Sequence, residues 1–211
     1  MEKTFMEAMD FRHACKVFEK KKKINDEDMN FILEAARKSP SSFGMEPWKF
    51  LVITNEELKV KLRPFCWDQP QITTCSHLVV ILAAIENVKP ESGVPRKKFA
   101  RREMPEEKYE FYLNLYKSHL TNTKTLLNDE NVYYWTARQT YIAFGNMMTA
   151  AAIKGIDSCP IEGFEKEKVE EVLGLDTTKY QVSVISPFGY RVNPQSKQLR
   201  EPIENIVEYI K

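Results

Sequence analysis

Two short segments near the start of the chain combine fixed cations with hydroxyl side chains. Residues 12–18 read Arg-His-Ala-Cys-Lys-Val-Phe, which places the cations Arg12 and Lys16 at the end of an amphipathic stretch. Residues 39–48 read Ser-Pro-Ser-Ser-Phe-Gly-Met-Glu-Pro-Trp, a hydroxyl-rich turn that ends one helix and leads into an apolar strand. Serine hydroxyls, free backbone N–H groups and nearby cations are the groups that bind an anion such as a phosphate. Together the two segments predict an anion-binding site.

A third segment with chemical character lies far downstream, where residues 160–163 read Pro-Ile-Glu-Gly. An exposed loop between a strand and a helix is the simplest interpretation, but Cys159, Pro160 and Ile161 are rather apolar for such a loop. Gly163 has no Cβ and therefore allows its backbone to approach a ligand closely. Each segment alone has an ordinary structural explanation, as an exposed basic turn, a helix-ending turn or a loop. Their occurrence together favours a binding site.

In order and spacing, the three segments resemble the nitroreductase family, in particular its oxygen-insensitive FMN enzymes of bacterial type, which take electrons from NAD(P)H. The resemblance covers nearly the whole chain, from Arg12 to Arg200. It implies an enzyme with FMN as cofactor, NAD(P)H as electron donor and a small planar acceptor such as a nitroaromatic or a quinone. Donor and acceptor would stack on the same flavin face in turn, which implies ping-pong, two-electron hydride transfer. The alternative is a flavin-binding carrier or sensor without turnover on the same fold.

The resemblance also implies roles for single residues. Lys16 and Glu162 are the candidate catalytic residues. Lys16 would lie near the flavin N1 and C2 oxygen, where a cation stabilises the charge that builds on reduction, and the backbone N–H of Glu162 would donate to N5. Ser41 and Ser42 would reach the flavin of the other subunit. The candidate cofactor-binding residues are Arg12, His13, Ala14, Lys16, Ser41, Ser42, Gly44, Asp68, Gln71, Pro160, Ile161, Glu162, Gly163, Lys197 and Arg200.

Two parts of this set depart from the family pattern. Asp68 stands where the family usually has Asn, and a carboxylate beside the flavin would oppose its anionic reduced form unless paired or protonated. Lys197 and Arg200 are three residues apart, whereas the family usually places its Lys and Arg two apart. Arg200 therefore aligns better with the family's phosphate-binding cations than Lys197 does.

The elements that must position these residues follow from the hydrophobic pattern. A first helix is expected over residues 5–12, and a second begins after the capping residue Asn25 and ends at Ser39-Pro40. The apolar runs over residues 48–53 and 77–84 predict strands, the second covered on both faces. The longest helix is expected between Asp129 and Lys154. It is apolar almost all round, which predicts burial on more than one side, in the core or against a second subunit.

The rest of the chain predicts shorter elements around this frame. A polar and basic surface excursion over residues 86–104 precedes a helix from Pro105 to about His119, and the whole stretch 86–125 matches the family only loosely. A short helix, a strand and an amphipathic tail are expected at 165–173, 180–185 and 202–211. We predict one domain over residues 1–211 of the α+β class, a small mixed sheet flanked by helices. The resemblance implies an intertwined homodimer with FMN at the subunit interface.

Composition excludes several other classes of protein. The 211 residues include 31 basic and 30 acidic side chains, a net charge of +1, which gives no general attraction to nucleic acid or to an anionic membrane. No segment approaches the roughly 20 apolar residues that span a bilayer. The seven glycines form no Gly-x-Gly, which argues against a Rossmann or Walker A nucleotide site. The four cysteines form no Cys-x-x-Cys pair, so neither a metal nor a disulfide framework is expected. Together with the N-terminus, which opens directly into a helical pattern, this predicts a cytoplasmic protein.

Overall fold

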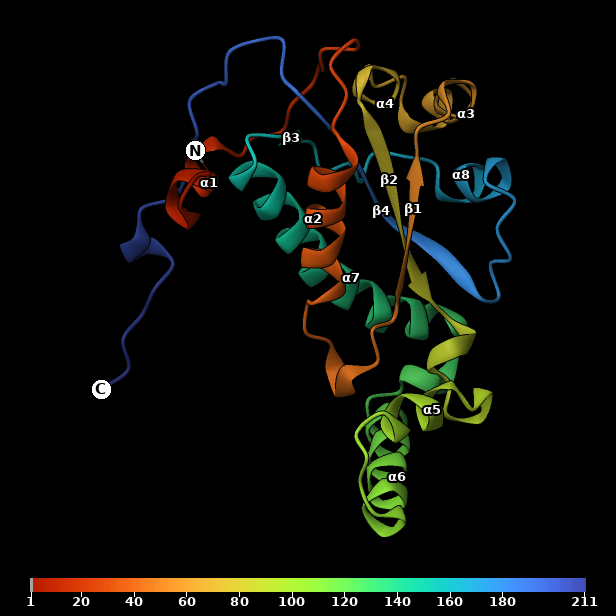
Figure 1. The fold of residues 1–211 in the computed structure, drawn as a ribbon. Coiled ribbons are helices and arrows are strands. Elements are labelled where there is room, and N and C mark those ends of the chain that lie inside the picture. The colour runs from red at the N-terminus through yellow and green to blue at the C-terminus, as the bar shows by residue number, and fades with distance from the viewer. Residues whose placement is uncertain (1) are drawn as a thin grey trace.

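The computed structural model describes residues 2–211 and contains a four-stranded sheet packed against helices (Figure 1). The strands lie in the order β1-β2-β4-β3, and each neighbouring pair is antiparallel. Parallel pairing among the described residues is the isolated bridge between Ala14 and Ser158. The predicted α+β class with a small sheet flanked by helices is confirmed, but the sheet is antiparallel and not mixed as predicted, because β1, β2, β4 and β3 run alternately in opposite directions. The strands are β1 (Trp48–Ile53), β2 (His77–Ala84), β3 (Asp157–Ser158) and β4 (Tyr180–Gly189).

Helices cover both faces of this sheet. Those predicted over 5–12, 25–39 and 129–154 are confirmed to within two residues, whereas α3, α4 and α5 were not expected. At the start of α2 the side chain of Asn25 accepts a hydrogen bond from the Asp28 N–H at 2.8 Å, as predicted for a capping residue. The helices are α1 (Phe5–Phe11), α2 (Asp26–Arg37), α3 (Glu56–Leu62), α4 (Gln71–Thr74), α5 (Val94–Ala100), α6 (Glu106–Asn122), α7 (Asp129–Ile153) and α8 (Lys166–Val172).

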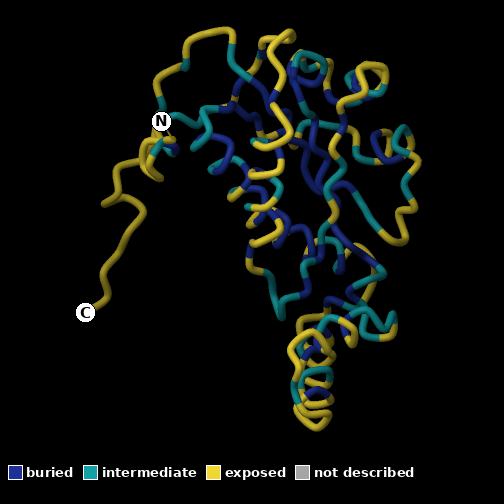
Figure 2. Tube along the Cα trace, viewed as in Figure 1, coloured by how far each residue is buried: buried dark blue, intermediate teal, exposed yellow. Residues whose placement is uncertain are grey.

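The central strand β2 divides the core into two layers. Side chains alternate along a strand, so Val79 and Ile81 face α2 and α7, while Leu78, Val80 and Leu82 face the opposite layer. That second layer is built from the segment after α1 together with α3, α4, α8 and the turn after β3. Burial on both faces explains the uninterrupted apolar run of β2, and the sheet is buried throughout its centre (Figure 2).

Residues 86–127 form a separate helical lobe at one end of the sheet, which contains α5 and α6 (Figure 1). Its residues Val88, Phe99 and Tyr116 belong to a buried cluster that also includes Met45 and, on α7, Trp135. Residues 86–104, predicted as a polar surface excursion, therefore include side chains that pack in the core. The basic residues of α5 made this packing difficult to predict from the sequence. Helix α6 begins after Pro105 as predicted and continues to Asn122, slightly beyond the expected end.

The C-terminal tail leaves the body of the chain and lies in the open (Figure 2). Its only regular element among the described residues is a 3₁₀ turn over Ile203–Asn205. The apolar side chains expected to form one face of an amphipathic segment are exposed, up to 93% for Ile210. Among residues 2–211, no helix combines the length and apolar character needed to cross a membrane.

Candidate functional site

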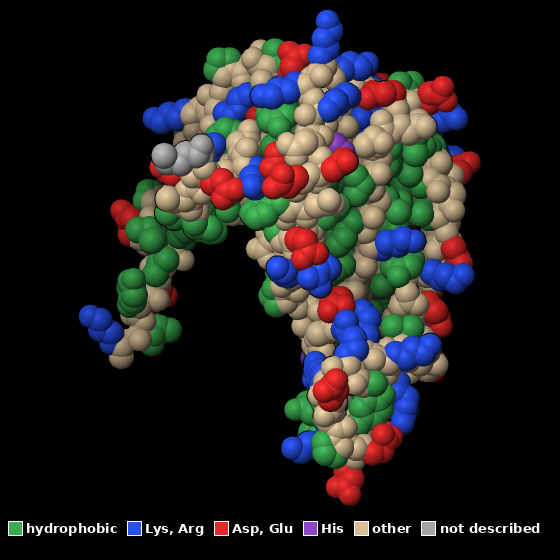
Figure 3. All heavy atoms as spheres, in the orientation of Figure 1, with side chains coloured by type: hydrophobic (Ala, Val, Ile, Leu, Met, Phe, Trp, Pro, Cys, Tyr) green, Lys and Arg blue, Asp and Glu red, His purple; other side chains and the backbone are tan. Residues whose placement is uncertain are grey.

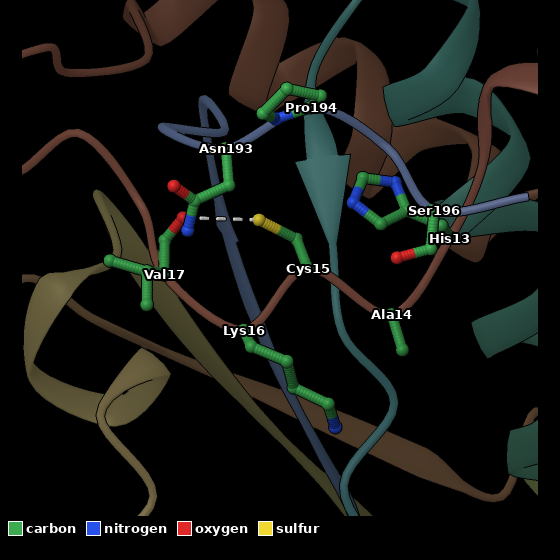
Figure 4. Close-up of a pocket in the computed structure, with 8 residues that line it drawn as sticks. All are labelled: His13, Ala14, Cys15, Lys16, Val17, Asn193, Pro194 and Ser196. Carbon is green, nitrogen blue, oxygen red and sulfur yellow. Dashed lines mark hydrogen bonds between the residues drawn. The ribbon is translucent and has the colours of Figure 1, made fainter.

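Two of the three sequence motifs meet at the end of β3. The Cys15 N–H donates to the Ser158 carbonyl at 3.1 Å, which holds segment 12–18 beside the strand. Lys16 Nζ lies 3.7 Å from Cys159 Sγ, a contact between residues 143 apart in the sequence. The side chains of Cys15 and Lys16 point in different directions, so that Lys16 leaves the small cavity beside Cys15 (Figure 4). The predicted cation thus lies at the head of the 160–163 turn.

The turn over residues 160–163 is fixed at both of its ends. Ile161 pairs with Ile185 through backbone hydrogen bonds of 2.9 and 3.2 Å. The Gly163 carbonyl accepts a hydrogen bond from Gln69 Nε2 at 3.0 Å. A Cβ on Gly163 would lie 2.6 Å from two carbons of the Trp67 ring, so glycine at this position allows the ring to approach the backbone closely, and a larger residue would displace the ring or the turn.

Glu162 is exposed at the surface of this turn, with a side-chain partner from the long helix. The Tyr141 hydroxyl, on α7, donates to Glu162 Oε1 at 2.6 Å. Burial raises the pKa of Tyr141, and the hydrogen bond to Glu162 raises it further, so the hydroxyl remains a donor at neutral pH. The carboxylate of Glu162 therefore has a defined orientation.

Gln71 and Asp68, the two candidates from the segment before β2, lie in different surroundings. Gln71 is 1% exposed, and its Nε2 donates to Gln69 Oε1 at 2.7 Å and lies 3.8 Å from Cys159 Sγ. Within residues 2–211 the buried Oε1 of Gln71 has no hydrogen-bond partner. The Asp68 side chain is 79% exposed, and its Oδ1 lies 3.9 Å from Arg63 Nε. Asp68 is therefore a solvated, weakly paired carboxylate.

Three candidate phosphate-binding cations line one cavity of about 450 Å³: Arg12, Lys197 and Arg200. Gln198 connects the two segments, because its Nε2 donates to the Arg12 carbonyl at 2.5 Å. None of the three cations forms an ion pair with a carboxylate among the described residues. A cavity surrounded by such cations can accept a phosphate.

His13 and Ala14 also border this cavity, but His13 has structural contacts as well. Its Nδ1 lies 3.6 Å from Asp157 Oδ1, and Asp157 in turn binds Arg191 at 2.6 Å. Burial lowers the pKa of His13, the charge of Arg191 lowers it further, and Asp157 acts in the opposite direction. His13 is therefore neutral at pH 7.

Residues 41–46, here called the serine loop, lie beside α7 and away from β3. The Ser42 N–H donates to Gln139 Oε1 on α7 at 2.9 Å, and Ser41 Oγ accepts from the Glu46 N–H at 2.8 Å. Gln139 precedes the C-terminal end of α7 by 14 residues, about 21 Å at the helical rise. Strand β3 follows that end (Figure 1), and Lys16 contacts Cys159, the residue directly after β3. Within one chain, Ser41, Ser42 and Gly44 are not brought to Lys16.

Comparison with known proteins assigns this geometry to a family. The model described as "Nitroreductase family" matches residues 9–190. The chain belongs to the nitroreductase family. A relative from Bacillus subtilis named "Putative NAD(P)H nitroreductase YfkO" is 41% identical over 213 residues, which cover 97% of this chain and 96% of the relative.

Solved structures of other family members have the same fold. A "putative NAD(P)H:FMN oxidoreductase" from Staphylococcus epidermidis superimposes with a TM-score of 0.85 at 25% identity, covering 100% of this chain and 98% of that one. A "putative nitroreductase in complex with FMN" from Exiguobacterium sibiricum gives a TM-score of 0.79 at 26% identity, covering 99% and 98%. The predicted family is confirmed, and FMN and NAD(P)H are the molecules that these relatives' names mention.

Sequence reasoning did not identify three residues that position the site of this family member. Trp67 packs on Gly163, Gln69 binds the Gly163 carbonyl, and Tyr141 binds Glu162. Gln69 is only two residues before the candidate Gln71, so its polar side chain was a local signal. Trp67 and Tyr141 had no such signal, because an aromatic residue reads as core or surface until its contacts are known.

Proposed function

We propose that the chain is an FMN-dependent NAD(P)H oxidoreductase that reduces nitroaromatics, quinones or similar planar acceptors, two electrons at a time, in a ping-pong cycle. The observation that carries this proposal is the contact of Lys16 with Cys159 at the head of the 160–163 turn, beside a cavity bordered by three cations without carboxylate partners. The names of the relatives support it. When bound, FMN supplies two-electron chemistry between a nicotinamide and an acceptor.

The residues present fit FMN. Arg12, Lys197 and Arg200 would hold the phosphate, because they carry positive charge around one cavity. Gln71 would face the ring, since buried polar atoms are normally hydrogen-bonded and its acceptor Oε1 has no donor partner among residues 2–211. A ring N–H would satisfy that oxygen.

The residues of the turn then prepare the site for electron transfer. Lys16, which is exposed in the single chain, would stabilise negative charge that develops on a bound flavin beside it, and this effect is strongest where water is excluded. Tyr141 holds the Glu162 carboxylate, and Gln69 holds the Gly163 carbonyl, so the turn presents a fixed backbone. The sequence offers no Gly-x-Gly nucleotide motif, so nicotinamide and acceptor would share one binding space. They must occupy it in turn, which is the basis of the ping-pong order.

We further propose that the working unit is a homodimer. The distance between the serine loop and Lys16 is consistent with a site completed by Ser41 and Ser42 of a second copy. The single chain also exposes apolar side chains, including Ile142 on α7 and Ile206 in the tail. Several apolar side chains of the tail are visible at the surface (Figure 3). Obligate dimer interfaces bury about 2,000–5,000 Å² of total accessible surface and are more hydrophobic than transient ones. Sedimentation should give a dimer, and a flavin-loaded, active monomer at micromolar concentration would contradict it.

The test of the function begins with the colour of the purified protein. Cofactor released by heat should run as FMN on chromatography, whereas FAD or no flavin would exclude the proposal. Under anaerobic conditions NADH or NADPH should bleach the flavin, and a planar acceptor should restore it, with parallel double-reciprocal plots. Bound FMN that neither nucleotide reduces would instead indicate the carrier or sensor.

Arg12→Ala should weaken FMN retention by about tenfold or more, as loss of a charge-assisted contact does, while the matched control Lys20→Ala should not.

A further inference from the structure

The loop that carries the candidate serines has an unusual backbone. Phe43, Gly44 and Glu46 have φ values of 55°, 66° and 44°. This left-handed region is uncommon for residues with a side chain, and it persists only where the surroundings hold the backbone in place. The backbone of the serine loop therefore needs contacts from other parts of the chain to hold it in this conformation.

That support comes from cations at and after the end of α5. Lys98 Nζ donates to the Glu46 carbonyl at 3.2 Å and also to the Met45 carbonyl. Arg102 donates to the Phe43 carbonyl at 2.7 Å, and Arg101 pairs with the Glu46 carboxylate at 3.2 Å. The carbonyls of Phe43, Met45 and Glu46 thus accept hydrogen bonds from side chains more than 50 residues downstream, and the Glu46 carbonyl also accepts one from the Trp48 N–H at 2.9 Å.

The α6 helix also contacts the serine loop, through the side chain of Phe43. The Phe43 ring packs edge-on against Tyr116, with 5.2 Å between centroids, and lies 5.4 Å from the His119 ring. The Arg102 guanidinium is also close to Gly44, where a Cβ would lie 3.3 Å from its terminal nitrogen. The lobe over residues 86–127 therefore contacts the serine loop in three ways: by hydrogen bonds to its carbonyls, by an ion pair and by aromatic packing.

We propose that Lys98 and Arg102 are positioning residues, through which this lobe fixes the serine loop and sets the affinity of the protein for FMN. The inference rests on the proposed function, in which Ser41 and Ser42 bind the flavin of the partner subunit. Neither cation needs to touch the flavin. Each binds carbonyls of the loop, so that the two hydroxyls and the neighbouring N–H groups keep one arrangement before FMN binds.

The experiment compares Lys98→Met, Arg102→Gln and their combination with the matched control Lys97→Met, which changes an exposed neighbour on the same helix. Amide hydrogen exchange of residues 42–46 is measured in flavin-free protein, because the N–H groups of Ser42, Gly44, Met45 and Glu46 are all hydrogen-bonded there. The dissociation constant for FMN is measured by quenching of its fluorescence, and thermal unfolding monitors the fold.

In the combined variant we expect these amides to exchange faster by about tenfold and the dissociation constant for FMN to rise by about tenfold. Changes of this size are expected for loss of a charge-assisted hydrogen bond. Arg102→Lys should recover part of both, since it keeps a cation, and Lys97→Met should match the wild type. Because Arg102 is exposed, Arg102→Gln should not unfold the protein. This single variant therefore tests the inference even if the combined variant fails to fold. Unchanged exchange, or faster exchange with unchanged FMN affinity, would overturn the inference. Wild-type protein that does not bind FMN would remove the proposed function and the affinity part of this inference, whereas the exchange rates would still decide whether the lobe holds the loop.

Discussion

Gly163→Ala tests the geometry of the 160–163 turn directly. The new Cβ would lie 2.6 Å from Cε3 and Cζ3 of Trp67 and 3.2 Å from Cδ2. Carbon atoms pack best at about 3.5–4.0 Å, so either the ring or the turn must move by about 1 Å. Trp67 is 69% exposed, and its ring can swing toward water. We therefore expect a small loss of stability, about 1 kcal/mol, at the low end for overpacking.

The effect on the reaction should be larger than the effect on stability. The Gly163 carbonyl is bound by Gln69 at 3.0 Å, and displacement of the turn lengthens that hydrogen bond. A misplacement of about 1 Å near reacting groups can cost about 100-fold in rate. We expect anaerobic reduction of the bound flavin by NAD(P)H, followed by stopped-flow absorbance, to slow by at least about tenfold. The thermal midpoint should fall by only about 2–4 °C.

A double-mutant cycle identifies the cause. Gly163→Ala is introduced into the wild type and into Trp67→Ala, where the clashing ring carbons are gone. The loss of stability and of rate should largely disappear in the second background. Gly145→Ala is the control, because among residues 2–211 no atom outside the adjacent backbone of α7 lies within 4 Å of its Cβ position, and alanine favours the α7 helix by up to about 1 kcal/mol. Equal losses in both backgrounds would refute the ring contact as the reason that this position is glycine.

Three further outcomes are expected. Lys16→Met should slow flavin reduction by about 10–100-fold with little change in nicotinamide binding, because the charge it stabilises appears only during the reaction; equal losses of rate and binding, or the same loss in Lys20→Met, would contradict this role. Tyr141→Phe removes the 2.6 Å hydrogen bond to Glu162 and should change stability by no more than about 1.5 kcal/mol, while it slows flavin reduction because the carboxylate loses its fixed orientation. An unchanged rate of reduction would show that this orientation is unimportant. Because burial lowers the pKa of His13 in the folded state, the unfolded chain binds the proton more readily, so stability should fall as pH drops below about 6.5. Urea unfolding at pH 7.5 and pH 5.5 should show a smaller fall for His13→Gln, and an identical fall would refute the assignment.

Much of the fold could be predicted from short windows of the sequence. The start of α2 follows from Asn25 and the acidic residues after it, and β2 follows from its unbroken apolar run. Such signals act over a few residues, through backbone hydrogen bonds and side-chain periodicity. Helix α5 escaped prediction because three of its seven residues are basic, although Phe99 is fully buried. Its role as a support depends on a loop about 55 residues earlier, which local patterns do not report.

The candidate site shows the same division. By itself the sequence determined which side chains are available: the cations Arg12 and Lys16, the serine pair, and the Pro160–Gly163 turn. Only the tertiary structure decided which of them meet. Pairing of the segment after α1 with β3 brings Lys16 to Cys159, whereas Ser42 is bound to Gln139, 14 residues before the C-terminal end of α7. Residue types and spacing are local properties, but these distances result from how strands pair and helices pack across the whole sheet, and no window of the sequence contains that information.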